Sequence, residues 1–426
     1  MSILSVLLCV SCGVEDKPGT TTPLVFKHGK LTGDPRVMQG LLHEFEREHP
    51  GVTVREEVLP ASTDQQHQYY AINLDSSQVA FDVLAVDVIW VSEFARAGWI
   101  RSVDTLVPPA DRHDYFESAL EAATFKHKLH AIPWYIDAGV LYYRRDLLER
   151  YGFAPPRTWP ELVRTARTIM DEERDPALKG FLWPGKQYEG LVCVAFEFMW
   201  GHGGSIIDTA GLRDAEAALV FMRDLIRDGI SPELVSTADE EATRLLFSDG
   251  RAVFMRNWPY VWSLLQQQDS PLRGKIGVGT LPAFPGHRSA STLGGWMLAV
   301  PTHASQPQLA EAFIAFLSRP VIQQRLALEL GYHPARRSLY DDPALRRTHP
   351  ALNEVFPVLL TARPRPITPY YLMLSQILQP ELSAVVVGRK TPEAALASVR
   401  KQMTHLGVEH EGRESGEYRE KAVVPR

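Results

Sequence analysis

Four short segments of the sequence place aromatic residues in stretches that are rich in glycine or proline and that we interpret as loops. They contain Trp134-Tyr135, Trp258-Pro259-Tyr260, Trp296 and Tyr370-Tyr371. Each has polar groups close by in the chain, namely Asp137, Arg256 with Asn257, the backbone of Gly294-Gly295, and Arg365. Packing of a hydrophobic core accounts poorly for aromatic side chains in loops, so these segments are candidates for ligand contacts.

Aromatic rings and polar groups in this combination suit a carbohydrate. A pyranose has an apolar C–H face that lies on an aromatic ring, and its hydroxyl groups bind carboxylates, amides and guanidinium groups through strong, charge-assisted hydrogen bonds. Any single tryptophan could instead be partly buried where two domains meet. Four such clusters in one chain favour a sugar site.

Two carboxylates are candidates to hold the sugar hydroxyls. Asp87 lies near the end of an apolar run, residues 81–88, that predicts a buried strand, and ligands of open α/β sheets bind at the carboxyl ends of strands. Asp137 lies in residues 131–139, between two predicted lobes. The structural alternatives are a helix N-cap for Asp87 and a turn carboxylate for Asp137. We expect both to act as ionised acceptors at neutral pH.

Paired carboxylates in a sugar cleft are also what a glycoside hydrolase needs, so a hydrolase using Asp87 and Asp137 is the main alternative function. Retaining hydrolases need carboxyl groups ~5 Å apart, and inverting ones need ~6.5–9.5 Å. A receptor for peptides or polyamines is a further alternative, because paired tryptophans also bind cations.

Motifs for other chemistries are missing. Residues 388–391 resemble the end of a phosphate-binding loop but lack its upstream glycine. His43 and His49 are six residues apart, which places them on different faces of a helix rather than on one face as zinc requires. No Gly-x-Ser-x-Gly motif occurs. We therefore predict no cofactor, no metal and no catalytic residue.

Length and charge set further limits. The chain has 426 residues and a formal net charge of −6, so we expect two or three domains and no nucleic-acid partner, because nucleic-acid binding needs clustered cations. No apolar run approaches the ~20 residues that span a bilayer.

Alternating strand and helix patterns predict an open α/β sheet at the start of the chain. Residues 24–28, 52–58 and 81–88 resemble strands, and Asp34-Pro35 opens a helix whose apolar residues recur at helical spacing up to Phe45. A second unit is predicted to begin near Ala131, with further strands at 140–143, 250–255 and 276–281. Another apolar strand is expected at 292–300. The last third reads as mostly helical.

The first 23 residues resemble an export signal followed by a tether. Residues 3–10 are apolar, residues 13–23 are polar, and Cys9-Val-Ser-Cys12 resembles a bacterial lipobox. The alternative is a buried N-terminal strand. We expect lipidation at Cys12 and a lipoprotein held at the membrane in the periplasm or at the cell surface. Only Cys193 then remains as a thiol, so no disulfide is expected.

The sequence resembles extracellular solute-binding proteins of the maltodextrin-binding type, and within them the trehalose/maltose-binding proteins of ABC importers. The resemblance spans about residues 26–406. Its most specific stretches are residues 135–148, 185–193, 256–260, 293–296 and 364–371.

The resemblance implies a two-lobed α/β fold of the Venus-flytrap type (type II), each lobe an open sheet flanked by helices, with the ligand cleft between the lobes. Residues 24–133 plus 288–334 would form the N-terminal lobe and residues 134–287 plus 335–408 the C-terminal lobe, followed by a charged tail, 409–426. The implied function is capture of an α-linked disaccharide by a monomer that hands it to an ABC permease, without enzymatic activity.

The residues that match the sugar-contacting positions of the family are Asp87, Tyr135, Asp137, Trp258, Tyr260, Gly294, Gly295, Trp296, Arg365 and Tyr371. The family often has a carboxylate in the first loop after the first strand, and only Asp34 could serve here. Its short side chain and the neighbouring Lys30 depart from the pattern. Tyr188 and Glu189 open a helix that would face the cleft, and they are further candidates.

Overall fold

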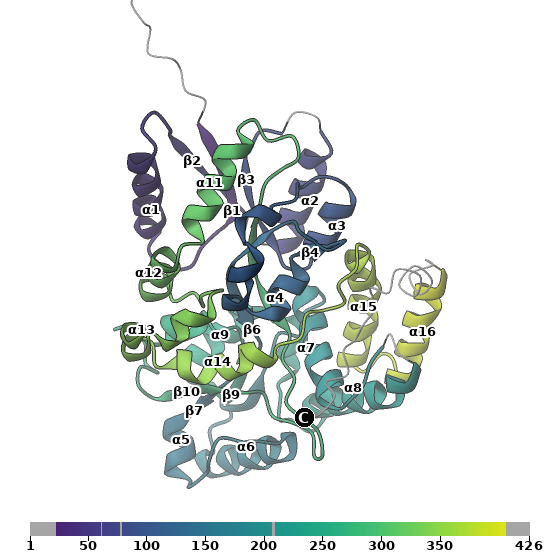
Figure 1. Ribbon diagram of the computed structural model, residues 1–426. Helices are drawn as coiled ribbons and strands as arrows, with labels where there is room; N and C mark the ends of the chain where they lie inside the picture. The colour runs from purple at the N-terminus through teal and green to yellow at the C-terminus, as the bar shows by residue number, and fades with distance from the viewer. Residues whose placement is uncertain (1–22, 61, 77–78, 207–208, 406–426) are drawn as a thin grey trace, which may run out of the picture.

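The structure, a computed structural model, describes residues 23–60, 62–76, 79–206 and 209–405 (Figure 1). Two open sheets with helices packed against them form the two halves of the molecule, which confirms the predicted α/β class. The expected signal segment, its Cys12 and the tail from residue 409 lie outside the described residues.

The first sheet has five strands in the order β2-β1-β3-β11-β6. Their bounds are β1 Leu24–Gly29, β2 Val54–Leu59, β3 Val83–Asp87, β6 Ile132–Ala138 and β11 Leu293–Ala299. β1 pairs in parallel with β2 and β3, whereas β11 runs antiparallel to both β3 and β6. The start of β11 therefore lies beside the ends of β3 and β6.

The second sheet has four strands in the order β10-β7-β9-β8. They are β7 Val140–Arg144, β8 Lys179–Leu182, β9 Ala252–Asn257 and β10 Ile276–Gly279. A small hairpin, β4 Thr124–Phe125 with β5 Lys128–Leu129, stands apart from both sheets. Only Gly139 separates β6 of the first sheet from β7 of the second.

The helices near the first sheet are α1 Pro35–Glu48, α2 Thr63–Leu74, α3 Val91–Arg96, α4 Glu117–Ala122, α11 Pro307–Leu317 and α12 Pro320–Leu330. α1 forms as its sequence predicts. Asp34 caps it by accepting the Arg36 backbone N–H at 2.9 Å, Pro35 occupies its first turn, and its apolar stripe is buried up to Phe45.

The helices near the second sheet are α5 Arg145–Arg150, α6 Trp159–Glu173, α7 Glu189–Gly201, α8 Leu212–Arg227, α9 Glu240–Ser248 and α10 Val261–Leu265. The C-terminal part adds α13 Pro343–Thr348, α14 Ala351–Thr361, α15 Tyr371–Val386 and α16 Pro392–His405. Short 3-10 helices lie at Asp104–Leu106, Pro109–Asp114, Thr209–Gly211, Glu233–Thr237 and Arg337–Asp341. α15 packs against α7, α8 and α16 (Figure 1).

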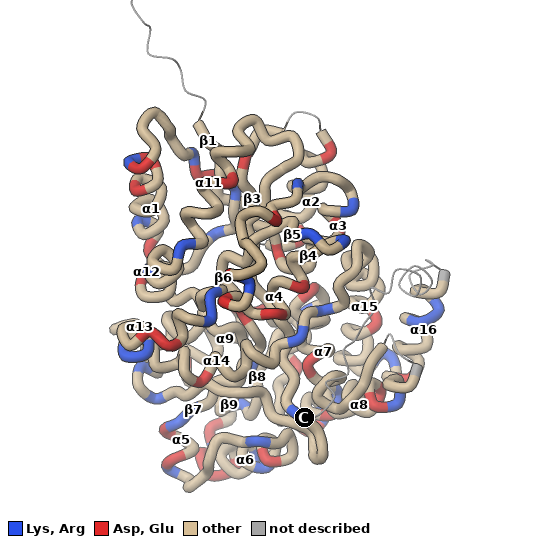
Figure 2. Tube along the Cα trace, viewed as in Figure 1, with Lys and Arg blue, Asp and Glu red and all other residues tan. Residues whose placement is uncertain are grey.

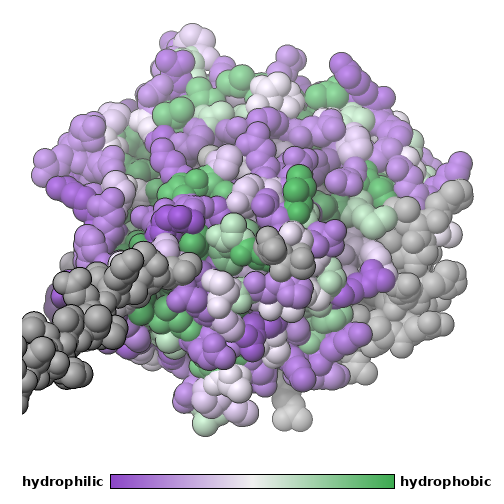
Figure 3. Space-filling model, turned by 90° about the horizontal axis from the view of Figure 1, so that it is seen from above, coloured by the Kyte–Doolittle hydropathy of each residue, from purple (hydrophilic) through white to green (hydrophobic). Residues whose placement is uncertain are grey.

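Basic and acidic residues are interspersed along the chain (Figure 2). The face seen from above is mostly hydrophilic, with hydrophobic residues in small separate groups (Figure 3). In the part of the chain that the structure describes, no helix has the length and apolar character needed to cross a bilayer.

The structure corrects the loop assignment of Trp134 and Tyr135, which lie within β6. Trp296 lies within β11, in agreement with the strand expected at 292–300 and not with a loop. Strand β6 accommodates Pro133 because the pairing with β11 shifts register just after Trp296. Trp134 is only 1% exposed and packs edge-on against Phe26, with ring centroids 5.7 Å apart. It is therefore a core residue.

β6 also belongs to the first sheet as far as Ala138, whereas the sequence placed the change of unit near residue 131. An apolar run of this length forms a strand in either sheet. Its local pattern therefore does not reveal which neighbour it pairs with.

Candidate functional site

The predicted site residues on the first sheet meet along one edge. In the strand register, Trp296 of β11 lies opposite Asp87 of β3 on one side and Tyr135 of β6 on the other. Gly294 lies opposite Asp137. This arrangement follows from the antiparallel direction of β11, which brings three distant segments of the chain together.

The two glycines of this edge leave room that a side chain would fill. A Cβ on Gly294 would lie 2.9 Å from Cζ3 of Trp258, so the indole ring of Trp258 packs directly against the β11 backbone. Gly295 has φ +122°, in the left-handed region, and a Cβ there would lie 2.5 Å from the carbonyl oxygen of Tyr135. Both positions require glycine, one for close approach and the other also for its backbone conformation.

Asp137 is a partly buried residue with one buried, unused acceptor atom. Its Oδ1 has no hydrogen-bond partner among the described residues. Burial, with a smaller contribution from the charge of Asp87, raises the pKa of Asp137 to about 8. The expectation that Asp137 is ionised at neutral pH is therefore wrong, because a charge on a buried oxygen without a partner is costly. A ligand hydroxyl would supply the missing donor.

Asp87 has partners that Asp137 lacks. Its Oδ1 accepts the backbone N–H of Ile89 at 3.1 Å and lies 3.6 Å from Nη2 of Arg365. Burial raises the pKa of Asp87, and the Arg365 charge and the Ile89 N–H oppose that shift. The helix N-cap role considered for Asp87 is wrong, because α3 has Trp90 at its N-cap and no side-chain cap hydrogen bond. The bond from Ile89 is instead local to the turn that follows β3.

Arg365 is held in place by Glu189, the first residue of α7. Its Nη1 donates to Oε1 of Glu189 at 2.6 Å, and its Nη2 donates to the carbonyl oxygen of Leu293 at 3.3 Å. The hydroxyl of Tyr371 donates to the same Glu189 oxygen at 2.6 Å. Nε of Arg365 is buried without a partner in the described part of the chain, which leaves one charged donor free for a ligand.

Trp258, Tyr260 and Tyr188 are oriented by two acidic residues at the start of α9. The indole N–H of Trp258 donates to Oε1 of Glu240 at 3.2 Å, and the Tyr188 hydroxyl donates to the other oxygen of Glu240. The Tyr260 hydroxyl donates to Oε1 of Glu241 at 3.0 Å. Sequence reasoning missed both glutamates, because an acidic pair in the first turn of a helix is already explained by the helix dipole.

The first loop reaches the cluster through Thr32 rather than through Asp34. The backbone N–H of Thr32 donates to the Tyr332 hydroxyl at 2.7 Å, and the Tyr332 ring lies 4.3 Å from that of Tyr135, centroid to centroid. The Asp34 carboxylate caps α1 and binds the Arg36 side chain. Tyr332 was also missed by the sequence analysis, since only the fold brings it next to Tyr135.

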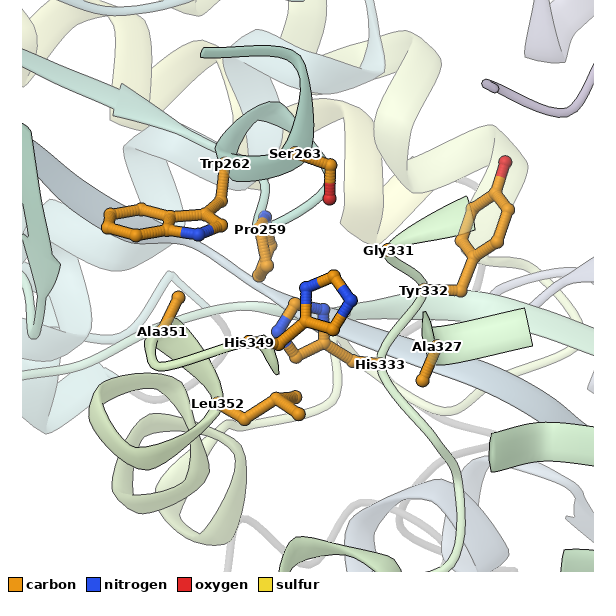
Figure 4. A pocket seen from close by; sticks show the side chains of 10 residues that line it. All are labelled: Pro259, Trp262, Ser263, Ala327, Gly331, Tyr332, His333, His349, Ala351 and Leu352. Carbon is orange, nitrogen blue, oxygen red and sulfur yellow. The ribbon is translucent and has the colours of Figure 1, made fainter. Parts of the chain in front are cut away.

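A small cavity lies next to the site residues, and Figure 4 shows the side chains around it. Tyr332, whose ring contacts Tyr135, and Pro259, which lies between Trp258 and Tyr260 in the sequence, both line this cavity. His333 and His349 both contribute their imidazole rings to its lining (Figure 4). Neither ring nitrogen of His333 has a hydrogen-bond partner among the described residues.

Acid is expected to destabilise the folded chain through His333. Burial lowers the pKa of this imidazole to about 3, whereas the unfolded chain takes up the proton near pH 6.5. The folded state therefore loses stability as the pH falls below ~6.5, by about 2 kcal/mol between pH 7 and 5. His333→Gln cannot be protonated and should lose correspondingly less. Urea unfolding at both pH values measures this, and an equal pH dependence of the two proteins would contradict it.

The chain is similar to known solute-binding proteins in sequence and in structure. Residues 29–324 match the family described as bacterial extracellular solute-binding protein. A probable ABC transporter-binding protein of Deinococcus radiodurans is 34% identical over 368 residues, which cover 84% of this chain and 87% of the relative. The maltose-bound structure of T. maritima MalE3 has a TM-score of 0.84 and 36% identity, covering 90% of this chain and 99% of that chain.

More distant relatives differ in the ligand that their names give. A mannitol-binding protein of Pseudomonas aeruginosa is 23% identical over 392 residues, covering 85% of this chain and 88% of the relative. The family match extends over more than half of the chain, and the Deinococcus relative is aligned over most of both proteins. By sequence and by its two-lobed α/β fold, this chain belongs to the bacterial extracellular solute-binding proteins.

Proposed function

We propose that this chain captures an α-linked disaccharide of the trehalose or maltose kind by closing its two lobes on it, and delivers it to the permease of an ABC importer. The family supports the broader part of this statement. It makes the chain the exported, solute-binding component of an ABC sugar transporter and not an enzyme. The hydrolase alternative is therefore set aside.

The observation that supports a sugar ligand is the unpartnered Oδ1 of Asp137 between aromatic side chains. Trp258 packs against Gly294, directly opposite Asp137, and Trp296 follows two residues later on the same strand. Rings next to a buried acceptor offer what one pyranose needs, a surface for its apolar face and a partner for a hydroxyl. The similarity to a maltose-bound protein at 36% identity favours a disaccharide over the polyol of the more distant relative.

We further propose that the chain crosses between the lobes near Gly139 and near Thr292. Gly139 lies between the two sheets, and its N–H donates to the Thr292 carbonyl oxygen at 3.3 Å. The Ser291 hydroxyl donates to the Gly139 carbonyl oxygen at 2.7 Å. Two crossing segments bonded to each other would act as a hinge, and closure around it would bring the contacts of both lobes to the ligand together.

A thermal-shift screen tests the proposed ligand. Because a ligand that binds only the folded state raises its apparent stability, trehalose, maltose, sucrose and palatinose are compared with mannitol at the same concentrations. We expect an α-linked disaccharide to raise the melting temperature most and mannitol to have little effect. A larger shift with mannitol than with every disaccharide would contradict the proposal.

The membrane anchor is a separate proposal. We expect the mature monomer to begin at an acylated Cys12, since two or more acyl chains give stable anchoring whereas one gives marginal binding. Mass spectrometry of the protein from its native host should find a lipid-modified N-terminal cysteine. A mature terminus beyond Cys12, or an unmodified Cys12, would refute the anchor and leave the sugar proposal standing.

A further inference from the structure

We propose that Glu197 is a positioning residue for sugar binding, which holds Arg256 under the ring of Trp258 and at the same time holds the segment that leads into β11. Glu197 would not touch the ligand itself. The inference rests on the proposed function, because it takes Trp258 as part of the sugar site.

Glu197 and Arg256 form a buried, two-point ion pair. Nε of Arg256 donates to Oε2 of Glu197 at 2.8 Å, and Nη2 donates to Oε1 at 2.5 Å. The side chains are 2% and 1% exposed, respectively. The pair joins α7 to β9. Two parallel hydrogen bonds fix the plane and the position of the guanidinium group, which a single contact would not do.

The fixed guanidinium group lies against Trp258. Its central carbon is 4.2 Å from the centroid of the indole ring, within the range of a cation–π interaction. The ring also packs against Gly294 and donates its N–H to Glu240. Of these three supports, only the one from Arg256 depends on a charge that Glu197 holds in place.

The same carboxylate contacts both segments that link the two sheets. Oε1 of Glu197 accepts the backbone N–H of Thr292 at 3.2 Å, and the Thr292 hydroxyl donates to the Cys193 carbonyl oxygen, one turn earlier on α7, at 2.9 Å. A Cβ on Gly139 would lie 1.9 Å from this Oε1. One buried carboxylate thus connects the crossing segments to the guanidinium group that lies against the Trp258 ring.

The first variant is Glu197→Gln, which keeps the shape of the side chain but removes its charge and one acceptor. We expect sugar affinity to fall about tenfold, corresponding to ~1.4 kcal/mol. The reason is that Arg256 keeps only one of its two hydrogen bonds to this side chain. In a Trp258→Ala background the same change should cost little further affinity, since there is no ring left to position. A purely structural role predicts additive losses instead.

Asp146→Asn is the matched control. Asp146 pairs with Arg144 through two hydrogen bonds of 2.7 Å each. Arg144 lies on β7 at the end of the second sheet away from Asn257, because Val140 is the β7 residue paired with Asn257. This variant breaks a two-point ion pair between β7 and α5, which is less buried than that of Glu197, and it should leave sugar affinity unchanged.

Gly139→Ala disturbs the same ion pair by its volume and leaves both charges in place. Gly139 is not among the glycines with positive φ, but a Cβ there would lie 1.9 Å from Oε1 of Glu197 and 2.7 Å from Nη2 of Arg256, so the pair must shift to admit alanine. We expect a loss of affinity that is not additive with that of Glu197→Gln.

Fluorine NMR of protein labelled with 5-fluorotryptophan reports on the surroundings of the Trp258 ring without any sugar. The Trp258 signal, assigned through Trp258→Phe, should shift in Glu197→Gln, while that of Trp99 stays in place. Wild-type affinity and an unmoved Trp258 signal in Glu197→Gln would overturn the inference. If Trp258→Ala itself binds sugar like wild type, it is the proposed site that fails, and the NMR shift still reports on the positioning.

Discussion

Trp296→Ala is expected to lower sugar affinity by about thirtyfold or more while the chain stays folded. Trp296 lies on β11 between Asp87 and Tyr135 and is only partly buried, so part of the residue is available to a ligand. Its edge-on contact with Trp90, at 5.6 Å between centroids, holds the ring in one orientation. Buried aromatic anchors of this kind cost ~2–4 kcal/mol when truncated, which is at least thirtyfold in affinity.

Trp99→Ala is the control for this experiment. Trp99 is also partly buried, and its ring lies 5.5 Å from that of Phe94 in the same half of the molecule. Its loss should lower the melting temperature without changing the affinity measured by calorimetry. An unchanged affinity in Trp296→Ala would exclude its ring from the site, and loss of its cooperative melting would identify it as a core residue.

Asp137→Ala is expected to weaken binding roughly tenfold to a hundredfold, because it leaves sugar hydroxyls without a partner in a dry cleft at ~1–3 kcal/mol per group. Asp137→Asn should lose less at neutral pH. With a pKa of about 8, the wild-type carboxyl is mostly neutral at pH 7 before sugar binds, and an amide is then a close substitute in shape and charge.

The difference in sugar affinity between wild type and Asp137→Asn is expected to grow as the pH rises. As the pH rises through 8 the wild-type carboxyl ionises and becomes a stronger acceptor for hydroxyl groups, whereas asparagine does not change. The affinities of wild type and Asp137→Asn should therefore be similar at pH 6 and diverge at pH 9, with wild type the tighter. Calorimetric titration at both pH values measures the ratio. A constant ratio would show that Asp137 does not titrate in the site.

Local sequence signals predicted the elements well where the cause is local. The cap and apolar stripe of α1 after Asp34 and the apolar strand ending near Asp87 are confirmed. Motif order along the chain also identified the family and the fold class. The helix and the strand depend on residues within a few positions of one another. The family and the fold class follow from the order of the motifs along the chain.

The remaining features depend on contacts between distant segments. Trp134 was read as a loop residue because Pro133 precedes it, but the register shift in β11 accommodates the proline. Glu240 and Tyr332 join the site only through the fold, so their local context carried no signal. The charge state of Asp137 was wrong because burial, which sets its pKa, is a tertiary property.

A crystal structure of the chain with its best-binding disaccharide tests the central claim most directly. The account predicts a sugar in contact with the rings of Trp258 and Trp296, with one hydroxyl within hydrogen-bond distance of Oδ1 of Asp137. A sugar bound elsewhere, with Oδ1 of Asp137 still lacking a partner, would contradict it.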